Sequence, residues 1–498
     1  MLTSKTIVLG ITGSIAAYKA ADLASKLTQT GANVEVIMTE SATRFISPLT
    51  LRSITGRPVI TSMWELASEF SIEHVALAEA ADVVVIAPAT ANIIAHLAAG
   101  LADDMLTCTV LATKAPVIVA PAMHMGMFEN SITQDNLAKL KVRGFIIVGP
   151  DYGRLASGKM GLGRLVEVEK IIGTVKQVLG RSGDLTGKRI VVTAGGTQEA
   201  IDPVRYIGNR SSGKMGYAMA EAARDRGAEV TLITAPTSLP EPVGIEVTHV
   251  VTAVQMKEAV VKAIEQAEAL IMAAAVADYQ PKSAAKQKIK KEATGAGLTL
   301  EVIRTPDILA EVKGNFLRVG FAAETEDVLE NAKKKLENKQ LDLIAANDVT
   351  ALDSGFGVDT NKVTLISPDG KVESLPLMSK REVADKILDK VVALLSEQLI
   401  RRTEITLRLR SRTGEGSSYY IDIPEDQLSV FPNYRVPFRI ETDIDGLEAH
   451  IVPKHSKYGK AHFHLAKWFK GHPELKMGAG LIITVIEPMK KYRLEIVK

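Results

Sequence analysis

The stretch TIVLGITGSIAAYKAADLASKLTQTGANVEVIM, residues 6–38, decides the fold. It opens with Thr6–Ile11, a short apolar run rich in β-branched residues, which is typical of a strand buried on both faces of a sheet. Gly13 follows, and the residues from Ser14 to Thr28 have the periodicity of a helix. Val34–Met38 then predicts a second strand. Together they form a strand–turn–helix–strand unit, which indicates a doubly wound α/β fold.

The same unit returns after a polar, glycine-containing stretch at residues 180–184. Arg189–Thr193 predicts a strand and Lys214–Arg226 a helix. The letters GANVEVI that end the first unit reappear as GAEVTLI at residues 227–233. We therefore expect two doubly wound, Rossmann-like domains in place of one large one.

The last hundred residues have a different pattern, in which short strand-like runs are punctuated by proline and glycine. The expected strands are Glu404–Arg410, Tyr419–Ile423, Phe438–Thr442 and Leu481–Ile486. We divide the chain into three expected domains, residues 1–185, 186–400 and 401–498, of which the last is small and β-rich with no assigned role.

The length, net charge and cysteine content of the chain limit the classes of protein to which it can belong. A chain of 498 residues needs more than one core, and its formal net charge of +2 suggests neither a nucleic-acid nor a membrane partner. Its one cysteine, Cys108, excludes an intrachain disulfide and a zinc site built from several cysteines. Residues 1–10 do not have the pattern of a signal peptide, and no run of about 20 apolar residues occurs. We expect a cytoplasmic protein.

In the first domain, hydroxyl, amide and small side chains follow four expected strands. Ligands of open parallel sheets bind beyond the carboxyl ends of the strands, and helix starts there offer unpaired N–H groups to a phosphate. Each loop alone also fits a capped turn without a ligand, but four such loops favour one composite pocket. The residues are Gly13, Ser14, Thr39, Ser41, Thr90, Asn92 and Ala122.

Three segments of this domain resemble the flavin-containing phosphopantothenoylcysteine decarboxylases. They are GITGSIAAYKAA at 10–21, EHVALAEAADVVVIAPATANIIAHLAAGLADDML at 73–106 and PAMHMGMF at 121–128. The resemblance covers about residues 1–180 and implies that the seven residues above bind FMN. It also implies that His74 is catalytic, although on the residues alone a packed or capping histidine is the commoner explanation.

Two positions depart from the family pattern. His124 stands where the family usually has asparagine, and its imidazole can still donate a hydrogen bond to a substrate carboxylate. Ser157, in LASGKMGLGR at 155–164, replaces the usual cysteine proton donor. A hydroxyl is a far weaker acid than a thiol, whose ordinary pKa is about 8.5. One alternative is therefore an active ligase joined to an impaired decarboxylase half.

The second domain has several groups suited to phosphates. Ser211–Gly216 opens a helix with hydroxyls, glycines and a lysine, at a spacing that is not a Walker A motif. Ala273–Ala277 predicts the end of a buried strand, and Asp278 follows it. The lysine-rich residues 286–291 come next, and such a run is also typical of a solvated loop. Lys335 and Lys339 are four apart on one helix face.

The domain resembles the phosphopantothenate–cysteine ligases over about residues 186–395. The motifs occur in the family's order: TAGGTQEAIDPVRYIGNRSSGKMG at 193–216, AAVADYQP at 274–281, KIKK at 288–291, TPDIL at 305–309, GFAAET at 320–325 and LDLIAANDV at 341–349. The resemblance implies that Asn209 acts at an acyl-nucleotide intermediate and that Lys288 stabilises the reacting phosphate. The residues implied to contact the nucleotide, usually CTP, are Ala274, Asp278, Lys288, Pro306, Asp307, Ile308, Leu309, Phe321, Lys335 and Lys339.

Together the resemblances imply a bifunctional carboxy-lyase and acid–amino-acid ligase of coenzyme A biosynthesis. Its substrates would be 4′-phosphopantothenate, L-cysteine and CTP with Mg2+, and the ligase product would be the decarboxylase substrate. The families imply a homo-oligomer, with a trimeric decarboxylase and a dimeric ligase. A further alternative is a regulatory or nucleic-acid-binding protein that uses the tail. Its basis is Lys467–Lys470, which mixes basic and aromatic residues. The tail histidines His450, His455, His462 and His464 could in principle bind a metal. Surface or packed positions are the commoner explanation for both groups.

Overall fold

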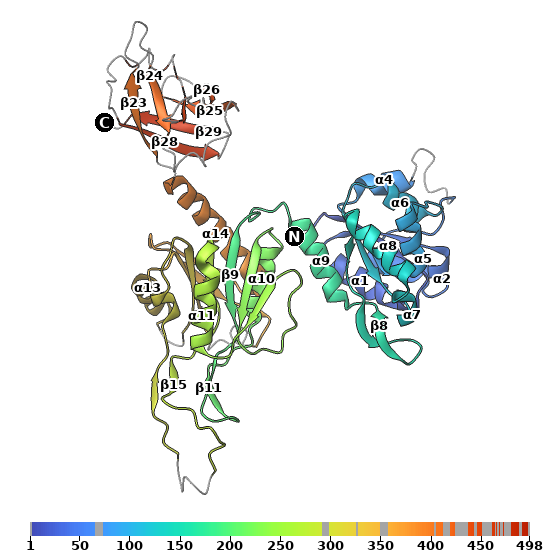
Figure 1. Ribbon diagram of the computed structural model, residues 1–498, viewed down its shortest axis with the longest axis horizontal. Helices are drawn as coiled ribbons and strands as arrows, with labels where there is room; N and C mark the ends of the chain where they lie inside the picture. The colour runs from blue at the N-terminus through green and yellow to red at the C-terminus, as the bar shows by residue number, and fades with distance from the viewer. Residues whose placement is uncertain are drawn as a thin grey trace. The chain divides into compact units, whose positions relative to one another are not determined.

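The computed structural model describes most of the first 402 residues and parts of the tail (Figure 1). The described residues are 2–64, 73–290, 298–324, 327–348, 357–402, 405–411, 419–423, 437–442, 446–450, 461–463, 465, 468, 472, 480–487 and 491–496. They form two compact units, Met1–Leu388 and Asp389–Lys498. No helix among these residues has both the length and the hydropathy needed to cross a membrane.

The first sheet is parallel throughout and has the strand order β3-β2-β1-β4-β5-β6. Its strands are β1 (Thr6–Ile11), β2 (Asn33–Met38), β3 (Val59–Ile60), β4 (Val83–Ala89), β5 (Val117–Pro121) and β6 (Ile146–Ile147). This is the Rossmann order, which confirms the predicted fold class of the first domain. The antiparallel hairpin of β7 (Asp151–Arg154) and β8 (Met160–Arg164) lies outside this sheet.

Helices cover both faces of the first sheet. They are η1 (Ile15–Ala17), α1 (Tyr18–Gln29), α2 (Glu40–Thr43), α3 (Pro48–Thr55), α4 (Glu73–Ala80), α5 (Ala91–Ala99), α6 (Met105–Ala112), α7 (Met125–Phe128), α8 (Ser131–Val142) and α9 (Val168–Gly180). Alternate residues of β1 face opposite cores: Ile7 and Leu9 pack with α1, α3 and α9, whereas Val8 packs with α5, α6 and α8. This is why the strand is apolar at every position.

The second sheet has the order β13-β12-β9-β14-β17-β18-β20-β21. Its strands are β9 (Arg189–Ala194), β12 (Glu229–Thr234), β13 (Glu246–His249), β14 (Ala269–Met272), β17 (Leu317–Glu324), β18 (Leu343–Asp348), β20 (Val363–Ile366) and β21 (Val372–Ser374). The strands from β13 to β18 are parallel, while β20 and β21 add antiparallel pairs at one edge. The second predicted Rossmann-like domain is thereby confirmed as well.

The remaining elements of this domain are helices and short strand pairs. The helices are α10 (Lys214–Arg224), α11 (Ala253–Ala263), η2 (Ile264–Gln266), α12 (Ile308–Glu311), α13 (Val328–Asn338) and α14 (Lys380–Arg402). The pairs are β10 (Gln198–Ala200) with β11 (Tyr206–Gly208), β15 (Tyr279–Pro281) with β16 (Val302–Arg304), and β19 (Thr360–Asn361) with β22 (Met378–Ser379). Gly216 lets α10 approach β9 closely, because a Cβ there would lie 2.6 Å from the Thr193 carbonyl oxygen.

The prediction of a strand at Ala273–Ala277 was wrong. β14 ends at Met272, and the chain then turns toward the loop after β9. Ala275 donates its N–H to the Gly195 carbonyl (2.8 Å) and accepts one from Thr197 (3.3 Å). The small alanine side chains let this segment pass close to the loop after β9. The run is therefore apolar because it packs against a loop, and it does not continue the strand.

The tail forms a seven-stranded sheet in the order β26-β25-β29-β28-β23-β24-β27, as the β-rich prediction requires. The strands are β23 (Ile405–Ser411), β24 (Tyr419–Ile423), β25 (Pro437–Glu441), β26 (Gly446–His450), β27 (Ala461–Phe463), β28 (Gly480–Glu487) and β29 (Lys491–Ile496). Phe438 and Tyr492 meet edge to face, with ring centroids 5.0 Å apart, and Trp468 is buried. His455, His464, Lys467, Phe469 and Lys470 lie outside the described residues.

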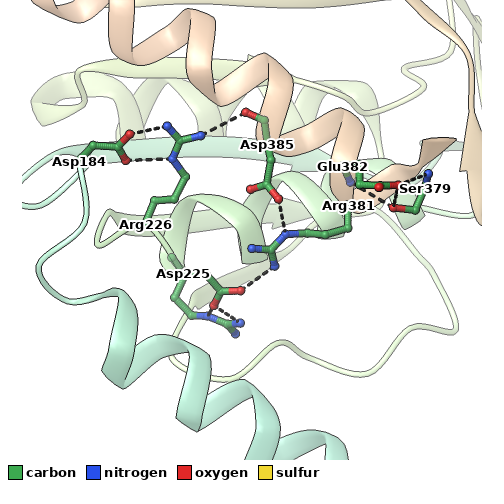
Figure 2. Close-up of polar contacts among 8 residues, drawn as sticks. Asp184, Asp225, Arg226, Ser379, Arg381, Glu382 and Asp385 are labelled. Atoms are coloured by element: carbon green, nitrogen blue, oxygen red, sulfur yellow. Dashed lines mark hydrogen bonds and ion pairs between the residues drawn. The ribbon is translucent and has the colours of Figure 1, made fainter. Parts of the chain in front are cut away.

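A network of buried charges fixes α14 to the end of α10 (Figure 2). Asp225 is 1% exposed, and its Oδ1 accepts hydrogen bonds from Arg224 Nε and Nη2 at 2.9 and 2.6 Å. Its Oδ2 accepts one from Arg381 Nη1 at 2.6 Å. Beside it, Arg226 pairs with the more exposed Asp184. Both oxygens of Asp225 are therefore used to hold arginines from two helical regions.

Replacing Asp225 should destabilise this unit strongly. Asp225→Ala leaves the buried Arg224 without its carboxylate, so we expect a loss of about 3–5 kcal/mol. Asp184→Ala removes a partner from a more exposed pair and should cost at most about 1 kcal/mol. Calorimetric unfolding of both variants measures the difference. Equal losses of unfolding free energy in the two variants would contradict the conclusion that Asp225 stabilises the unit more than Asp184 does.

Candidate active sites

The first candidate site lies at the carboxyl edge of the first sheet, between the loops after β1 and β4. Buried Thr12 links them: its Oγ1 donates to the Pro88 carbonyl (2.7 Å) and accepts the Thr90 N–H (3.1 Å). The strand order reverses at this point, because β1 pairs with β2 on one side and β4 on the other. Such switch points are the usual ligand sites of open α/β sheets.

The residues predicted to bind FMN lie on the loops and helix starts at this edge. Ser14, Thr39 and Thr90 each accept a backbone N–H at the start of η1, α2 and α5, respectively. Gly13 lies against Ser41, since a Cβ on the glycine would be 2.5 Å from the serine Cβ. The loop after β5 joins them through the Ala122 N–H, which donates to the Ala89 carbonyl at 2.9 Å. The seven residues are Gly13, Ser14, Thr39, Ser41, Thr90, Asn92 and Ala122.

The predicted catalytic residues come from separate elements. His124 precedes α7, where its Nδ1 accepts the Gly126 N–H at 3.2 Å. In neutral imidazole the proton then sits on Nε2, which leaves a donor available for a substrate oxygen. Ser157 is exposed in the turn between β7 and β8, and β8 contacts the His124 loop through a Met123 N–H bond to the Gly163 carbonyl (2.9 Å). His74 lies apart from both in the chain, in the first turn of α4.

The second candidate site is a cavity of about 820 Å³ at the corresponding switch point of the second sheet, between β9 and β14. It is lined by nearly all the residues predicted to contact the nucleotide or its acyl intermediate. These are Asn209, Ala274, Asp278, Pro306, Asp307, Ile308, Leu309, Phe321, Lys335 and Lys339. The cavity thus joins loops that are more than a hundred residues apart in the chain.

Hydrogen bonds fix the loops that line the cavity. Asn209 Nδ2 donates to the Val276 carbonyl at 2.9 Å, which orients the amide. The N–H of Ala274 donates to Thr193 Oγ1 at 3.1 Å. Directly after α13, Lys339 Nζ lies 2.9 Å from Asp307 Oδ1, whose side chain also caps α12. Cationic groups and oriented amides therefore face the same space.

Lys288 is the predicted site residue that does not line the cavity. It is exposed in the segment after β15, and its neighbour Ile289 is tied to a different loop. The Ile289 N–H donates to Asp202 Oδ2 at 3.2 Å, and Arg205 Nη2 donates to the Ile289 carbonyl at 2.7 Å. These bonds account for the position of Lys288, and its role stays a prediction.

Asp202 is the centre of that loop. Burial by itself raises the pKa of its carboxyl, but hydrogen bonds from Arg205 and from backbone N–H groups outweigh burial and hold the pKa at about 2. Arg205 Nε and Nη2 lie 3.0 and 2.6 Å from Asp202 Oδ2. The ionised carboxylate is therefore part of the structure around the Lys288 segment.

Asn361 and Lys380 line the cavity without having been predicted. Lys380 begins α14, a long way along the chain from the motifs that mark the site. In the sequence it belongs to a charged run that looks like a solvated helix surface. Only the return of α14 to the end of α10 brings it to the cavity, so local sequence patterns contain no signal for it.

Comparisons with known proteins agree with this arrangement. The family model Flavoprotein matches residues 1–180, and the model DNA/pantothenate metabolism flavoprotein C-terminal domain matches residues 185–395. The fold and the two sites thus define a flavoprotein-type domain joined to a pantothenate-metabolism domain.

The chain is 47% identical to the coenzyme A biosynthesis bifunctional protein CoaBC of Bacillus subtilis over 400 residues, which is 79% of this chain and 98% of that protein. It is 44% identical to the CoaBC protein of Escherichia coli over 402 residues, 80% of this chain and 99% of that one. A crystal structure of the C-terminal domain of a CoaBC protein, 43% identical, aligns with 43% of this chain and 100% of its own, with a TM-score of 0.37.

The chain belongs to the CoaBC family of bifunctional enzymes of coenzyme A biosynthesis. The two predicted activities, phosphopantothenoylcysteine decarboxylase and phosphopantothenate–cysteine ligase, are those of this family, and the prediction is confirmed. These comparisons do not favour the two alternative functions, an enzyme with an impaired decarboxylase half and a nucleic-acid-binding regulator.

The low pKa of Asp202 predicts a specific dependence on acid. Because its folded pKa of about 2 lies below the ordinary value of 3.8, the carboxylate stabilises the fold above about pH 4. This contribution is lost as the pH falls through about 2. Asp202→Asn should therefore show a flatter fall of the unfolding temperature between pH 4 and 2 than the unaltered protein, measured by circular dichroism. Parallel pH profiles would contradict the assignment.

Proposed function

We propose that the chain condenses 4′-phosphopantothenate with L-cysteine in the cavity of the second sheet, using CTP, and decarboxylates the product at the edge of the first sheet, using FMN. The cavity of about 820 Å³ carries this proposal, because it joins Asn209, Asp278 and Phe321 with the lysines at the end of α13. It lies at the switch point where nucleotides bind in such sheets.

The ligase reaction needs activation because a free carboxylate resists attack by an amine. The phosphopantothenate carboxylate attacks the α-phosphorus of CTP, and pyrophosphate leaves. The cysteine amine then attacks the acyl carbon, the amide forms and CMP departs. We assign Lys335 and Lys339 to the charge of the phosphates, and Asn209, oriented by the Val276 carbonyl, to the acyl-nucleotide. Lys288 remains our candidate for the α-phosphate, although it lies outside the cavity.

The cavity is compatible with Mg2+ held chiefly by the nucleotide. In the part of the chain that the structure describes, two carboxylates line it, and one of them, Asp307, is already paired with Lys339. Mg2+ commonly binds one or two carboxylates together with substrate phosphates, so Asp278 is the available protein group. The ion would lower the repulsion between the triphosphate and the attacking carboxylate.

The edge of the first sheet fits the phosphate of FMN. Hydroxyls and N–H groups gather at three helix starts, and the glycine at position 13 leaves no side chain between the loops. Bound FMN would supply the two-electron oxidation of the substrate thiol that makes loss of CO2 possible, and return the electrons afterwards. His124 would bind the departing carboxylate through Nε2–H, and His74 would move a proton.

We infer a division at about residues 185 and 400, a cytoplasmic location, and a homo-oligomer built from trimeric decarboxylase and dimeric ligase contacts. Sedimentation of the full chain tests the last of these, and a monomer would contradict it. We assign no function to residues 401–498.

Asn209→Ala should lower ligase kcat/KM by about 100-fold, as expected when one oriented donor is removed from a reacting centre. Asn338→Ala, at the exposed end of α13, is the matched control and should have no effect. Pyrophosphate release is measured with phosphopantothenate, cysteine and Mg2+, with CTP and ATP tested in turn. Faster turnover with ATP would contradict the nucleotide assignment, and equal rates for both variants would contradict the role of Asn209.

Purified protein supplied with 4′-phosphopantothenoylcysteine should release CO2. Ser157→Cys should raise formation of 4′-phosphopantetheine by about tenfold, because a thiol is a far better proton donor than a hydroxyl. Ser157→Ala should stay within about twofold of the unaltered protein. CO2 and phosphopantetheine are quantified together. A large loss in Ser157→Ala would show that the serine itself supplies the proton, contrary to this expectation.

A further inference from the structure

Besides Lys335 and Lys339, two further lysines line the ligase cavity from other helices. Lys214 begins α10 and Lys380 begins α14, and both line the cavity. Lys380 is only 6% exposed. A lysine is rarely buried to this extent unless something compensates its charge, so its surroundings require explanation.

Both lysines contact one short segment, Gly357–Asp359. Lys214 Nζ lies 2.8 Å from the Gly357 carbonyl oxygen and 2.8 Å from Asp359 Oδ1. Lys380 Nζ donates to the Val358 carbonyl at 2.5 Å, and its backbone N–H donates to the Asp359 carbonyl at 2.9 Å. Two ammonium groups thus share this segment, which supplies one carboxylate.

The neighbours of Lys380 are fixed on both sides (Figure 2). Ser379 donates through N and Oγ to Glu382 Oε2, at 2.9 and 2.7 Å. Arg381 is held by buried Asp225 and also by Asp385, 3.1 Å from its Nε. Ser379 thus caps α14, and Arg381 anchors its first turn to the body of the domain through Asp225, which holds Lys380 at the cavity.

Positive charges outnumber negative ones among the described residues that line the cavity. Six of these have cationic side chains: Arg210, Lys214, Arg304, Lys335, Lys339 and Lys380. Two of the described lining residues are carboxylates, Asp278 and Asp307. Burial, and then the nearby Lys214, lower the pKa of Lys380, which an anion beside it would reverse. The cavity therefore favours an anion with several negative charges.

We propose that Lys380 and Lys214 form a binding site for phosphate oxygens in the ligase cavity, beyond the nucleotide contacts assigned above. The inference rests on the proposed use of a nucleoside triphosphate. Two ligands of the reaction carry this chemistry, the phosphate chain of the nucleotide and the phosphate ester of 4′-phosphopantothenate. A purely structural alternative is that the lysines only hold Gly357–Asp359.

The test uses the full chain and the variants Lys380→Met and Lys380→Arg. Lys386→Met is the matched control, because Lys386 is exposed on the same helix and does not line the cavity. Inorganic pyrophosphate serves as the probe in calorimetric titrations, and ligase assays give KM separately for the nucleotide and for phosphopantothenate. Thermal unfolding is recorded for every variant.

We expect Lys380→Met to weaken pyrophosphate binding and raise the nucleotide KM by about 10- to 100-fold, the usual effect of losing one charged hydrogen bond. Lys380→Arg should recover most of the binding, and Lys386→Met should change neither value. A rise in the phosphopantothenate KM alone would support the same site and assign it to the phosphate ester. An altered unfolding temperature with unchanged pyrophosphate binding and both KM values unchanged would overturn the proposal.

The titration separates this proposal from the proposed function. If the unaltered protein prefers ATP to CTP, the nucleotide assignment fails, yet the difference in pyrophosphate binding between the unaltered protein and Lys380→Met still reports on the lysine. If CTP supports the reaction and Lys380→Met leaves pyrophosphate binding and both KM values unchanged, the proposed function stands and the lysine site fails.

Discussion

The structure depends on one constraint. In each of the two Rossmann-like sheets, the first strand pairs directly and in parallel with a strand from a later segment of the chain. β1 pairs with β4, and β9 pairs with β14. Because these strands run in the same direction, their following loops emerge at one edge. Residues that are far apart in the chain thereby become neighbours at this edge. The loops that carry them can then form a ligand site together.

Both sheets secure that edge with the same device. In each sheet a buried threonine lies at the end of the first strand, β1 or β9. Its side-chain oxygen accepts a backbone N–H from the loop that follows the neighbouring strand, β4 or β14. Thr12 does so with Thr90 in the first sheet, and Thr193 does so with Ala274 in the second, each at 3.1 Å. A side-chain oxygen thus satisfies a backbone donor where regular sheet pairing stops. The two halves of the enzyme therefore share a local solution as well as a strand order.

Much of the fold was predictable because buried parallel strands are continuous apolar runs. β1 and β9 are clear in the sequence for this reason, and most predicted nucleotide contacts proved to surround one cavity. Ala273–Ala277 misled the prediction because its small apolar residues serve close contact with a loop. The sequence did not predict that Lys288 lies outside the cavity or that Lys380 lines it, for another reason. Their positions depend on ties to Asp202 and Asp225, which are tertiary contacts that no local pattern encodes.

The attachment of α14 by arginine has a consequence for how the ligase tolerates changes of proton concentration. Guanidinium groups keep their charge at any physiological pH, and although burial lowers the pKa of Arg381, Asp225 and Asp385 raise it above its usual value. Burial and the nearby Lys214 lower the pKa of Lys380, the residue before it in the chain. The first turn of α14 is therefore attached by a charge that does not depend on the protonation state of this lysine.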